Sequence, residues 1–488
     1  MKIHNTLTRS KEELIPLTPG EVRMYVCGVT VYDLSHIGHA RSAIVFDVMR
    51  RYLEFKGYRV TFVKNFTDVD DKIIRRANEE GVSAHDLAER YIAAYREDMA
   101  ALGVRPADHE PKAMEHIPEM IVLIERLVAG GFAYLVDGDV YFEVRRFPAY
   151  GRLSGRNLEE LRVGARVEVD ERKRDPRDFA LWKAAKAGEP SWESPWGPGR
   201  PGWHIECSAM SMRYLGESFD IHGGGEDLIF PHHECEIAQS EAGTGKPFVR
   251  IWIHNGFVNL GAEKMSKSLG NILTVRELVK RHDPEALRLW LLGTHYRHPA
   301  EWSDERVSEA ARALRRLRGL VEEAERAGYA YTDLLELREG GKLGTTAAVL
   351  AEAEIVHKWS AFETAFGAAM EDDFNTPGAL AALFDLSREL NRYRGTPDAN
   401  IRVFSYGVAK LVTLAAVLGL ESFPIAEMVG PTGELRRQIE IRVAQREQAR
   451  KRRDWTEADK LRRELRDFGV TVEDAPSGPR WTWKSPEP

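Results

Sequence analysis

The pattern of residues 22–66 constrains the fold of this chain more than any other feature. Residues 22–27 form a short apolar run typical of a buried strand. From about Gly38, apolar residues recur every three or four positions, which predicts a helix, and Gly57 is a natural stop for it. Residues 58–66 then alternate like a second strand. This order implies parallel strands joined by a right-handed crossover, with a ligand crevice at the carboxyl end of the first strand.

Further segments extend this α/β unit. Thr67 and Asp68 offer an N-cap to a following helix, and strands resume near residues 219–222 and 249–253. Between them, residues 111–201 contain short β-like pieces, charged stretches and a closing loop rich in Pro, Gly and Trp. We therefore predict a Rossmann-type parallel-sheet domain in two halves, 1–110 and 202–282, with an inserted connective domain at 111–201.

The C-terminal part differs in character, because from Asp283 onward the pattern is largely helical. We expect linking helices over 283–345 and a helical bundle over 346–425, in which Pro377 and Gly378 separate two segments. A linker at 430–433 precedes a small unit at 434–488. Between residues 435 and 466, twelve Lys or Arg stand against six Asp or Glu, a local net charge of +6.

Composition bounds the function classes that remain. The 488 residues suggest about three domains, and a formal net charge of -7 argues against a general polyanion binder. No run of about 20 apolar residues could span a membrane, and the N-terminus has no signal-peptide pattern, so we expect a cytoplasmic protein. Three cysteines, Cys27, Cys207 and Cys235, are too few for a disulfide framework. They are core residues, metal ligands or reactive thiols.

Residues 36–39 (His-Ile-Gly-His) lie where the first strand passes to the helix. Two imidazoles three residues apart at a helix N-terminus share a face, and free backbone N–H groups favour a phosphate there. Gly38 allows a planar group to approach the backbone closely. These residues therefore indicate a nucleotide site. The alternative is a pair of ordinary surface histidines at a turn.

Residues 264–268 (Lys-Met-Ser-Lys-Ser) lie in a polar stretch between Gly261 and Gly270. Two lysines and two hydroxyls on a mobile loop can follow phosphate charge as it develops. Most isolated Lys/Ser loops are simply solvated surface.

A third group consists of Cys27, Cys207, His232 and Glu236. Positions 232 and 236 share a face if both lie on one helix, as zinc-ligand pairs often do. Two thiolates, one imidazole and one carboxylate form a plausible zinc-binding set. The long gaps resemble no zinc finger, so core cysteines beside an unrelated helix are the alternative.

The His-Ile-Gly-His and Lys-Met-Ser-Lys-Ser strings occur here in the order that is found in class I aminoacyl-tRNA synthetases. Resemblance to this class implies ATP binding in the crevice, with Mg²⁺, and activation of an amino acid as its adenylate. His36 and His39 would contact the triphosphate. Lys264 and Lys267 would steady the departing pyrophosphate, Lys267 above all.

Other stretches resemble cysteinyl-tRNA synthetases over most of the first domain. They are Tyr-Val-Cys-Gly-Val-Thr-Val-Tyr-Asp from residue 25, Gly-Trp-His-Ile-Glu-Cys-Ser-Ala-Met from 202, Phe-Asp-Ile-His-Gly-Gly-Gly from 219, Phe-Pro-His-His-Glu from 230 and Asp-Asp-Phe-Asn-Thr-Pro from 372. The resemblance implies one Zn²⁺ held by Cys27, Cys207, His232 and Glu236 in the pocket for L-cysteine. Gly28, Thr67, Trp203 and His222 would contact that substrate.

The implied zinc selects the substrate instead of performing the reaction. Shape alone separates cysteine from serine poorly, whereas zinc binds thiolate far better than a neutral hydroxyl. Cys235 is next to Glu236, where the family more often has another residue. Position 235 does not share the helix face of residues 232 and 236, so Cys235 is expected to pack as a small hydrophobic side chain.

The basic C-terminal unit completes the resemblance. Residues 450–453, Trp455 and Trp481 mix cations with aromatic rings, as anticodon-binding surfaces do. We expect tRNA(Cys) as the partner of a monomeric enzyme. Two competing hypotheses are a cysteine ligase of mycothiol biosynthesis, which needs no anticodon module, and an inactive tRNA-binding paralogue, which needs no complete set of site residues.

Overall fold

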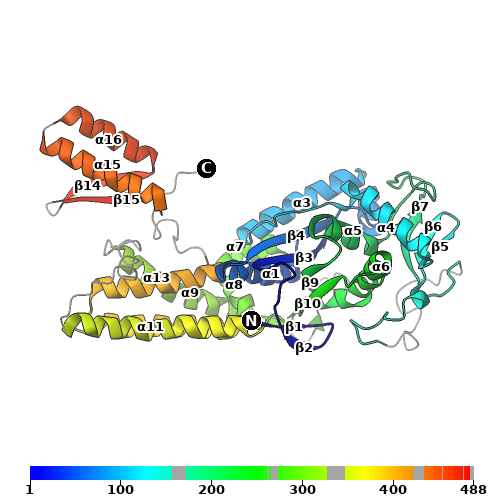
Figure 1. Cartoon of the computed structure of the whole chain (residues 1–488), viewed down its shortest axis with the longest axis horizontal. Helices are drawn as coiled ribbons and strands as arrows, with labels where there is room; N and C mark the ends of the chain where they lie inside the picture. The colour runs from blue at the N-terminus through cyan, green and yellow to red at the C-terminus, as the bar shows by residue number, and fades with distance from the viewer. Residues whose placement is uncertain are drawn as a thin grey trace. The chain divides into compact units, whose positions relative to one another are not determined.

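The computed structural model describes residues 1–156, 172–260, 263–264, 273–326, 347–420, 433–452, 454–475 and 478–483 (Figure 1). They fall into two compact units. The first comprises Met1–Ala311 and Ala368–Ala379, and the second comprises Arg312–Gly367 and Leu380–Pro488. The boundaries of the smaller domains that the sequence suggests stay predictions.

A four-stranded parallel sheet forms the centre of the first unit, in the order β10-β9-β3-β4. Its strands are β3 (Glu21–Thr30), β4 (Arg59–Thr67), β9 (Phe219–Gly225) and β10 (Val249–Asn255) (Figure 1). Helix α1 (Ile37–Phe55) joins β3 to β4, and α6 (Glu234–Thr244) lies between β9 and β10. The two crossovers leave the central β3/β9 pair in opposite directions. In sheets of this kind ligands bind in a crevice at the carboxyl ends of such strands, and the strand order confirms the predicted Rossmann-type α/β fold.

Local chemistry sets the ends of these elements. His36 caps the N-terminus of α1, and Gly57, with a φ of 89°, follows its end as expected. The next helix, α2 (Asp71–Glu80), is capped by Asp70, whose side chain accepts a hydrogen bond from the backbone of Lys72. The prediction that Thr67 or Asp68 caps it is therefore wrong. Both side chains have other partners, since the Thr67 hydroxyl donates to Glu206 and Asp68 accepts from Met114.

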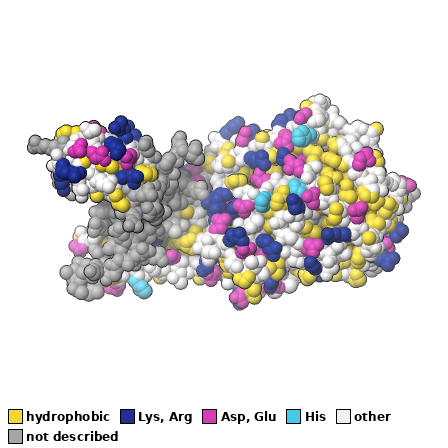
Figure 2. All heavy atoms as spheres, turned by 45° about the horizontal axis from the view of Figure 1, so that its top comes forward, with side chains coloured by type: hydrophobic (Ala, Val, Ile, Leu, Met, Phe, Trp, Pro, Cys, Tyr) yellow, Lys and Arg dark blue, Asp and Glu magenta, His cyan; other side chains and the backbone are white. Residues whose placement is uncertain are grey.

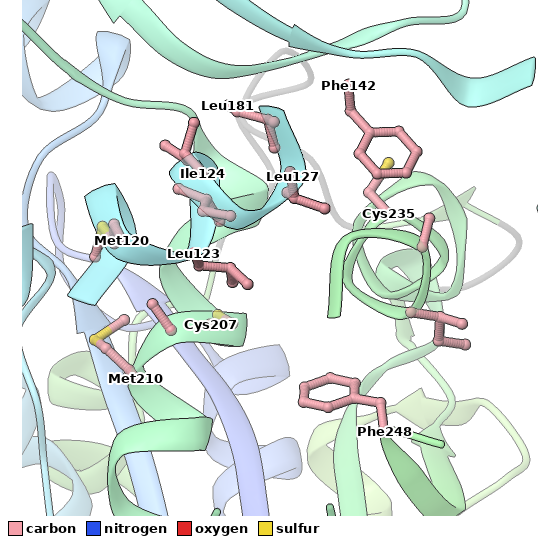
Figure 3. Packing of buried hydrophobic residues seen from close by; sticks show 14 of the residues in the cluster. Met120, Leu123, Ile124, Leu127, Phe142, Leu181, Cys207, Met210, Cys235 and Phe248 are labelled. Atoms are coloured by element: carbon pink, nitrogen blue, oxygen red, sulfur yellow. The ribbon is translucent and has the colours of Figure 1, made fainter. Parts of the chain in front are cut away.

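Residues 113–201 contribute α4 (Ile117–Ala129) and an antiparallel sheet in the order β5-β6-β7-β8. The strands are β5 (Ala133–Val136), β6 (Asp139–Phe142), β7 (Phe179–Ala184) and β8 (Gly199–Pro201). Helix α4 packs on α6 and on α5 (Trp203–Leu215). Figure 3 shows the buried side chains at this junction, among them Met120, Ile124 and Phe142. The antiparallel segment thus shares one hydrophobic core with the helices of the parallel-sheet unit.

The first unit also contains the elements that follow β10. These are β11 (Val258–Leu260), β12 (Glu263–Lys264), α7 (Val275–Arg281), α8 (Pro284–Leu292) and β13 (Ala300–Trp302). Strand β11 pairs antiparallel with β12 and parallel with β13. The N-terminal strands β1 (Lys2–Asn5) and β2 (Ser10–Glu13) form a hairpin, α3 (Ala84–Ala101) follows α2, and α9 (Asp304–Arg326) runs into the second unit.

Three long helices follow: α11 (Ala347–Glu371), α12 (Thr376–Arg394) and α13 (Ile401–Val417). The break between α11 and α12 lies at Asp373 and Phe374, which adopt positive φ angles of 64° and 49°. Pro377 and Gly378 belong to the first turn of α12, so the prediction that they form the break is wrong. Proline is tolerated in a first turn because the N–H it lacks has no helical partner there.

The C-terminal residues form helices α15 (Gly433–Lys451) and α16 (Trp455–Asp467) and an antiparallel hairpin. The hairpin consists of β14 (Val470–Ala475) and β15 (Gly478–Trp483), which the expectation of a largely helical C-terminal half had missed. A small core packs Ile439, Val443 and Leu465 against Val470 and Val472. Among the described helices of the whole chain, none combines the length and the apolar character that a membrane crossing requires.

Candidate metal centre and nucleotide site

Four side chains from separate elements meet in the crevice. Cys27 lies on β3, Cys207 on α5, Glu236 on α6 and His232 just before α6. Their ligand atoms all lie within 4.8 Å of one another. The two sulfur atoms are 3.4 Å apart, and the Cys27 sulfur is 3.3 Å from Glu236 Oε1. All four side chains are buried, so the fold gathers the residues that the sequence proposed as zinc ligands at one point.

His232 and Glu236 lie on two consecutive helical segments. His232 belongs to η5 (Ile229–His233), a short helical segment that precedes α6, and Glu236 lies in the first turn of α6. The sequence spacing predicts a shared face if both residues lie on one helix, and the two helical segments that carry them follow each other without a gap. Their contact survives, with His232 Nε2 3.0 Å from Glu236 Oε1, because η5 continues directly into α6.

Further histidines surround this cluster. His222 lies 2.8 Å from Glu236, and His233 lies 3.3 Å from the Cys27 sulfur. Cys27, His222, His233 and Glu236 form a second group with the spacing of metal ligands. Sequence reasoning had assigned His222 to the substrate and had left His233 out, although it is adjacent to His232. Its position in the string Pro-His-His-Glu was the available signal.

Two more buried histidines were missed. His204 Nδ1 is 3.0 Å from His232 Nδ1, and His254 Nε2 is 2.7 Å from His233 Nδ1. His254 in turn contacts the Thr6 hydroxyl at 2.8 Å. His204 orients the ring of His232, and His254 orients the ring of His233. Residues that hydrogen-bond to the ligands of a metal site commonly have this role. His204 lies within the string that begins at residue 202, which was the available signal, whereas His254 is marked only by its tertiary position.

Burial and charge decide the protonation of the cluster. Burial alone would raise the pKa of the Cys207 thiol, but the hydrogen bond from Cys27 lowers it to about 6. Burial alone would lower the pKa of His232, but Glu236 raises it to about 10. Burial lowers the pKa of His204, which favours a neutral ring beside His232. A thiolate at Cys207 is the form that binds metal ions.

The residues expected to contact the substrate lie around the cluster. The Thr67 hydroxyl is 2.9 Å from the buried Glu206, and the Trp203 ring stacks on His232 with ring centroids 4.2 Å apart. Trp203 is 38% exposed, so it forms the accessible side of the group. Gly28 donates its N–H to Asn65, and a Cβ atom at this position would lie 1.5 Å from the Asn65 carbonyl oxygen. Glycine is therefore required there by packing.

His36 and His39 stack on each other at the start of α1, with ring centroids 3.7 Å apart. His36 Nδ1 accepts a hydrogen bond from Gly38 N at 3.1 Å, and His39 Nδ1 accepts one from His36 N at 3.4 Å. Together they form a capping box made of two imidazoles. Both rings are only half-buried, so they remain accessible at the positive end of the helix dipole.

The second motif is only partly described. The backbone of Lys264 pairs with that of Asn259 in the β11–β12 ladder, and Lys267 lies outside the described residues. Beyond this segment, Ile37 N donates to the Leu273 carbonyl at 3.0 Å. The chain that leaves Lys264 therefore returns to the His36 loop.

Cys235 lies apart from the metal cluster. It is buried among hydrophobic side chains, which Figure 3 shows with Phe142 and Phe248, and its sulfur is 3.3 Å from the Tyr150 hydroxyl. Burial raises the pKa of this thiol, which keeps it protonated. It packs as a small hydrophobic residue, in agreement with its exclusion from the ligand set.

The surface charge is mixed. Figure 2 shows Lys and Arg side chains interspersed with Asp and Glu on the face in view, without one large field of either sign over the first unit. In the C-terminal unit, Lys451 and Arg452 are exposed, and Trp455 is 59% exposed. Arg453 lies outside the described residues, and only the backbone of Trp481 is described.

Three family models match successive parts of the chain. Residues 13–312 match the family described as "tRNA synthetases class I (C) catalytic domain". Residues 365–422 match the DALR domain, and residues 434–481 match the "Cysteinyl-tRNA ligase anticodon binding domain".

Curated relatives extend over the same length. Proteins named "Cysteine--tRNA ligase" from Syntrophobacter fumaroxidans and Alkalilimnicola ehrlichii are 52% and 54% identical, each over 99% of this chain and 99% of the relative. A protein of the same name from Geobacter sulfurreducens is 51% identical over 99% of this chain and all of its own length. The alternative of an amino-sugar ligase is therefore not supported.

Solved structures agree on the fold. Methionyl-tRNA synthetase of Mycobacterium tuberculosis, in complex with methionyl-adenylate, gives a TM-score of 0.61 at 17% identity, covering 83% of this chain and 92% of that one. A leucyl-tRNA synthetase complex (LeuRS) of Agrobacterium radiobacter gives 0.59 at 13% identity, covering 87% and 88%. From the catalytic match over residues 13–312 and relatives more than half identical over 99% of its length, the chain belongs to the cysteine–tRNA ligase family of class I aminoacyl-tRNA synthetases.

Proposed function

We propose that this chain activates L-cysteine with ATP and attaches it to the terminal ribose of tRNA(Cys). The observation that carries the proposal is the junction of two buried thiols, an imidazole and a carboxylate in the crevice of a class I fold. Such a junction suits recognition of a thiol substrate. The C-terminal match to an anticodon-binding domain supports tRNA as the acceptor.

The donor set fits zinc, because sulfur, nitrogen and carboxylate oxygen ligands all lie within 4.8 Å of one another. Cys27, Cys207, His232 and Glu236 would hold the ion. When bound, zinc favours a thiolate over the hydroxyl of serine and so supplies the discrimination that pocket shape cannot. Gly28, Thr67, Trp203 and His222 would orient the rest of the amino acid.

ATP would bind where α1 begins. The accessible imidazoles of His36 and His39, at the positive end of the α1 dipole, would contact the triphosphate, which Mg²⁺ accompanies. Lys264 and Lys267 would neutralise the charge that develops on pyrophosphate.

The reaction then has two steps. The cysteine carboxylate attacks the α-phosphate, giving cysteinyl-adenylate and pyrophosphate. A ribose hydroxyl of the terminal adenosine attacks the adenylate carbonyl and releases AMP. Neither step needs a covalent protein nucleophile, because positioning and charge stabilisation lower the barrier.

The remaining assignments follow the same family. The exposed cations of the C-terminal unit and Trp455 would contact the anticodon region of tRNA(Cys). The enzyme would act as a monomer in the cytoplasm. The domain limits 1–110 with 202–282, 111–201, 283–345, 346–425 and 434–488 belong to this proposal.

The test is ATP-dependent attachment of labelled cysteine to bulk tRNA, with labelled serine in a parallel reaction. The expected result is charging with cysteine, loss of the label on RNase treatment, and no charging with serine. Cysteine-dependent exchange of pyrophosphate into ATP without any transfer to tRNA would contradict the proposed acceptor. Equal charging with serine would contradict the thiol-selective pocket.

A further inference from the structure

Arg41 is a buried cation close to the His36–His39 motif. It lies on α1, is 1% exposed, and directs its guanidinium at backbone carbonyl groups from two other segments. Its Nη1 donates to the Phe257 carbonyl, and its Nη2 donates to that of His298. Nη2 also lies 3.3 Å from the Tyr296 carbonyl oxygen and 3.4 Å from that of His295.

These contacts require an arginine. The hydrogen-bond partners of Arg41 among the described residues are backbone carbonyl groups, and the Glu226 carboxylate also attracts its charge. Burial lowers the pKa of Arg41 to about 10, which leaves it charged at neutral pH. A planar fork of five donors can serve several carbonyl groups at once, whereas the point charge of lysine cannot.

The carbonyl groups belong to the base of the segment that carries the second motif. Phe257 directly precedes β11, and β11 pairs with β12, in which Lys264 lies opposite Asn259. The turn at residues 295–298 directly precedes β13, the other partner of β11. Ala300 N donates to the Phe257 carbonyl at 2.9 Å, and Gly256 N donates to that of Tyr296 at 2.9 Å. Arg41 thus connects the first motif to the strands that support the second.

The same motif also holds the far end of that segment. Ile37 N donates to the Leu273 carbonyl at 3.0 Å, and Val275 N donates to that of Ser35 at 2.9 Å. Both the chain that enters the Lys-Met-Ser-Lys-Ser stretch and the chain that leaves it are therefore attached within a few residues of His36.

The turn at 295–298 is fixed from its other side by Asp373. The Tyr296 hydroxyl donates to Asp373 at 2.6 Å, and Arg297 Nε donates to it at 2.7 Å. Asp373 also accepts from His4 N at 2.8 Å and is fully buried. This turn is consequently held between two buried side chains of opposite charge, Arg41 and Asp373, neither of which belongs to it.

We propose that Arg41 is a positioning residue for amino-acid activation: its guanidinium fixes the base of β11 and β13, and so the strands next to the second motif, beside ATP bound at His36 and His39. The inference rests on the proposed function and assigns to it a residue that contacts neither substrate. Displacement of a catalytic group by about 1 Å can cost on the order of 100-fold in rate. Loss of the Arg41 guanidinium should therefore lower kcat for adenylate formation.

The experiment compares Arg41→Gln and Arg41→Lys with Arg288→Gln. Arg288 is a matched control, because it is 0% exposed and also donates to backbone carbonyl groups, those of Leu102 and Gly103 at 3.3 and 3.2 Å. It also pairs with the buried Asp47, which lies on α1 outside both motifs. Each purified full-length variant is assayed by ATP–pyrophosphate exchange with cysteine and ATP varied separately, together with thermal unfolding and bound zinc.

For Arg41→Gln we expect kcat for exchange to fall by about 10- to 100-fold, with zinc content and the KM for cysteine close to the wild type. Arg41→Lys should recover part of kcat, and Arg288→Gln should lower the melting temperature without a comparable loss of kcat. If Arg41→Gln and Arg288→Gln lose activity only in proportion to stability, Arg41 is merely structural and the proposal fails. Wild-type protein without cysteine-dependent exchange would instead overturn the proposed function.

Tyr296→Phe covers the case in which Arg41 variants do not fold. It removes only the hydroxyl that binds Asp373 and keeps the ring. A reduction of kcat by about threefold to tenfold, without a change in the KM for cysteine, would support the positioning of the turn. Unchanged kcat in Tyr296→Phe, combined with failure of both Arg41 variants to fold, would overturn it.

Discussion

The pocket around Cys27 and the turn around His36 lie at the same crevice, yet they are built differently. The pocket takes its side chains from strands and helices far apart in sequence, and all four proposed ligands are buried. The turn consists of neighbouring residues, and its two half-buried imidazoles bind the backbone of their own helix. The described residues on either side of the second motif are attached by backbone hydrogen bonds, Lys264 to β11 and Leu273 to Ile37.

This difference matches the two tasks. Recognition of a single sulfur atom needs ligands that cannot adjust to oxygen, and burial from several directions provides that rigidity. Phosphate charge moves during adenylate formation, so it calls for accessible cationic groups near the start of α1. Substitutions in the pocket around Cys27 should therefore affect the use of cysteine, and substitutions near His36 should affect the use of ATP.

The largest effect is expected for Cys207→Ser. Loss of one thiolate should remove zinc and lower kcat/KM for cysteine by about 1000-fold, which corresponds to about 4 kcal/mol. ATP affinity should change little, because the contacts described for His36 and His39 do not include Cys207. Metal analysis and pyrophosphate exchange measure the two effects.

Cys235→Ser is the matched control, since this thiol is equally buried but contacts Tyr150 outside the cluster. It should retain zinc and cysteine selectivity. Normal cysteine activation by Cys207→Ser, or loss of zinc from Cys235→Ser, would show that the ligand set is wrong.

A smaller effect is expected for Lys267→Ala. Removal of this charge should lower kcat for adenylate formation by about 100-fold, because the pyrophosphate loses a cation in the transition state. The zinc content and the KM for cysteine should stay at wild-type values. The exposed Lys280, in the last turn of α7, provides the control Lys280→Ala. Equal losses in both variants would mean that general charge, and not position, is responsible.

The smallest effect separates two roles of His36. His36→Ala should lower the free energy of unfolding by about 1 kcal/mol, because the hydrogen bond from Gly38 N to the cap is lost. His36→Asn should restore stability, since asparagine is a good N-cap, but both variants should lose activation by about tenfold. Denaturant unfolding and pyrophosphate exchange supply the readouts. Full activity of His36→Asn would show that His36 serves only as the N-cap of α1.

Much of the fold could be predicted because local patterns determine it. The strands β3 and β4 and the helix between them follow from apolar spacing and from Gly57, and they were placed to within a few residues. Predictions were wrong where two local signals competed. Asp70 caps α2 because Thr67 and Asp68 bind other partners, and the break between α11 and α12 precedes Pro377 because proline suits a first helical turn.

The candidate site could be predicted only in part, for a similar reason. Cys207 and His232 were singled out because neighbouring residues form strings typical of a family. No comparable string marks His254 or Arg41. Their partners lie far away in the sequence, so only the folded chain shows that one orders the histidines and the other holds two strands.

The sequence by itself determined the parallel α/β order, the two motifs and the chemical types of the proposed ligands, because these depend on periodicity and on residue identity. Tertiary structure alone decided that Cys27 and Cys207 lie 3.4 Å apart, that His233 and His254 join their surroundings, and that Arg41 links the two motifs. The physical reason is that a parallel sheet brings the ends of distant strands to one edge. Which side chains meet there depends on the packing of the whole domain.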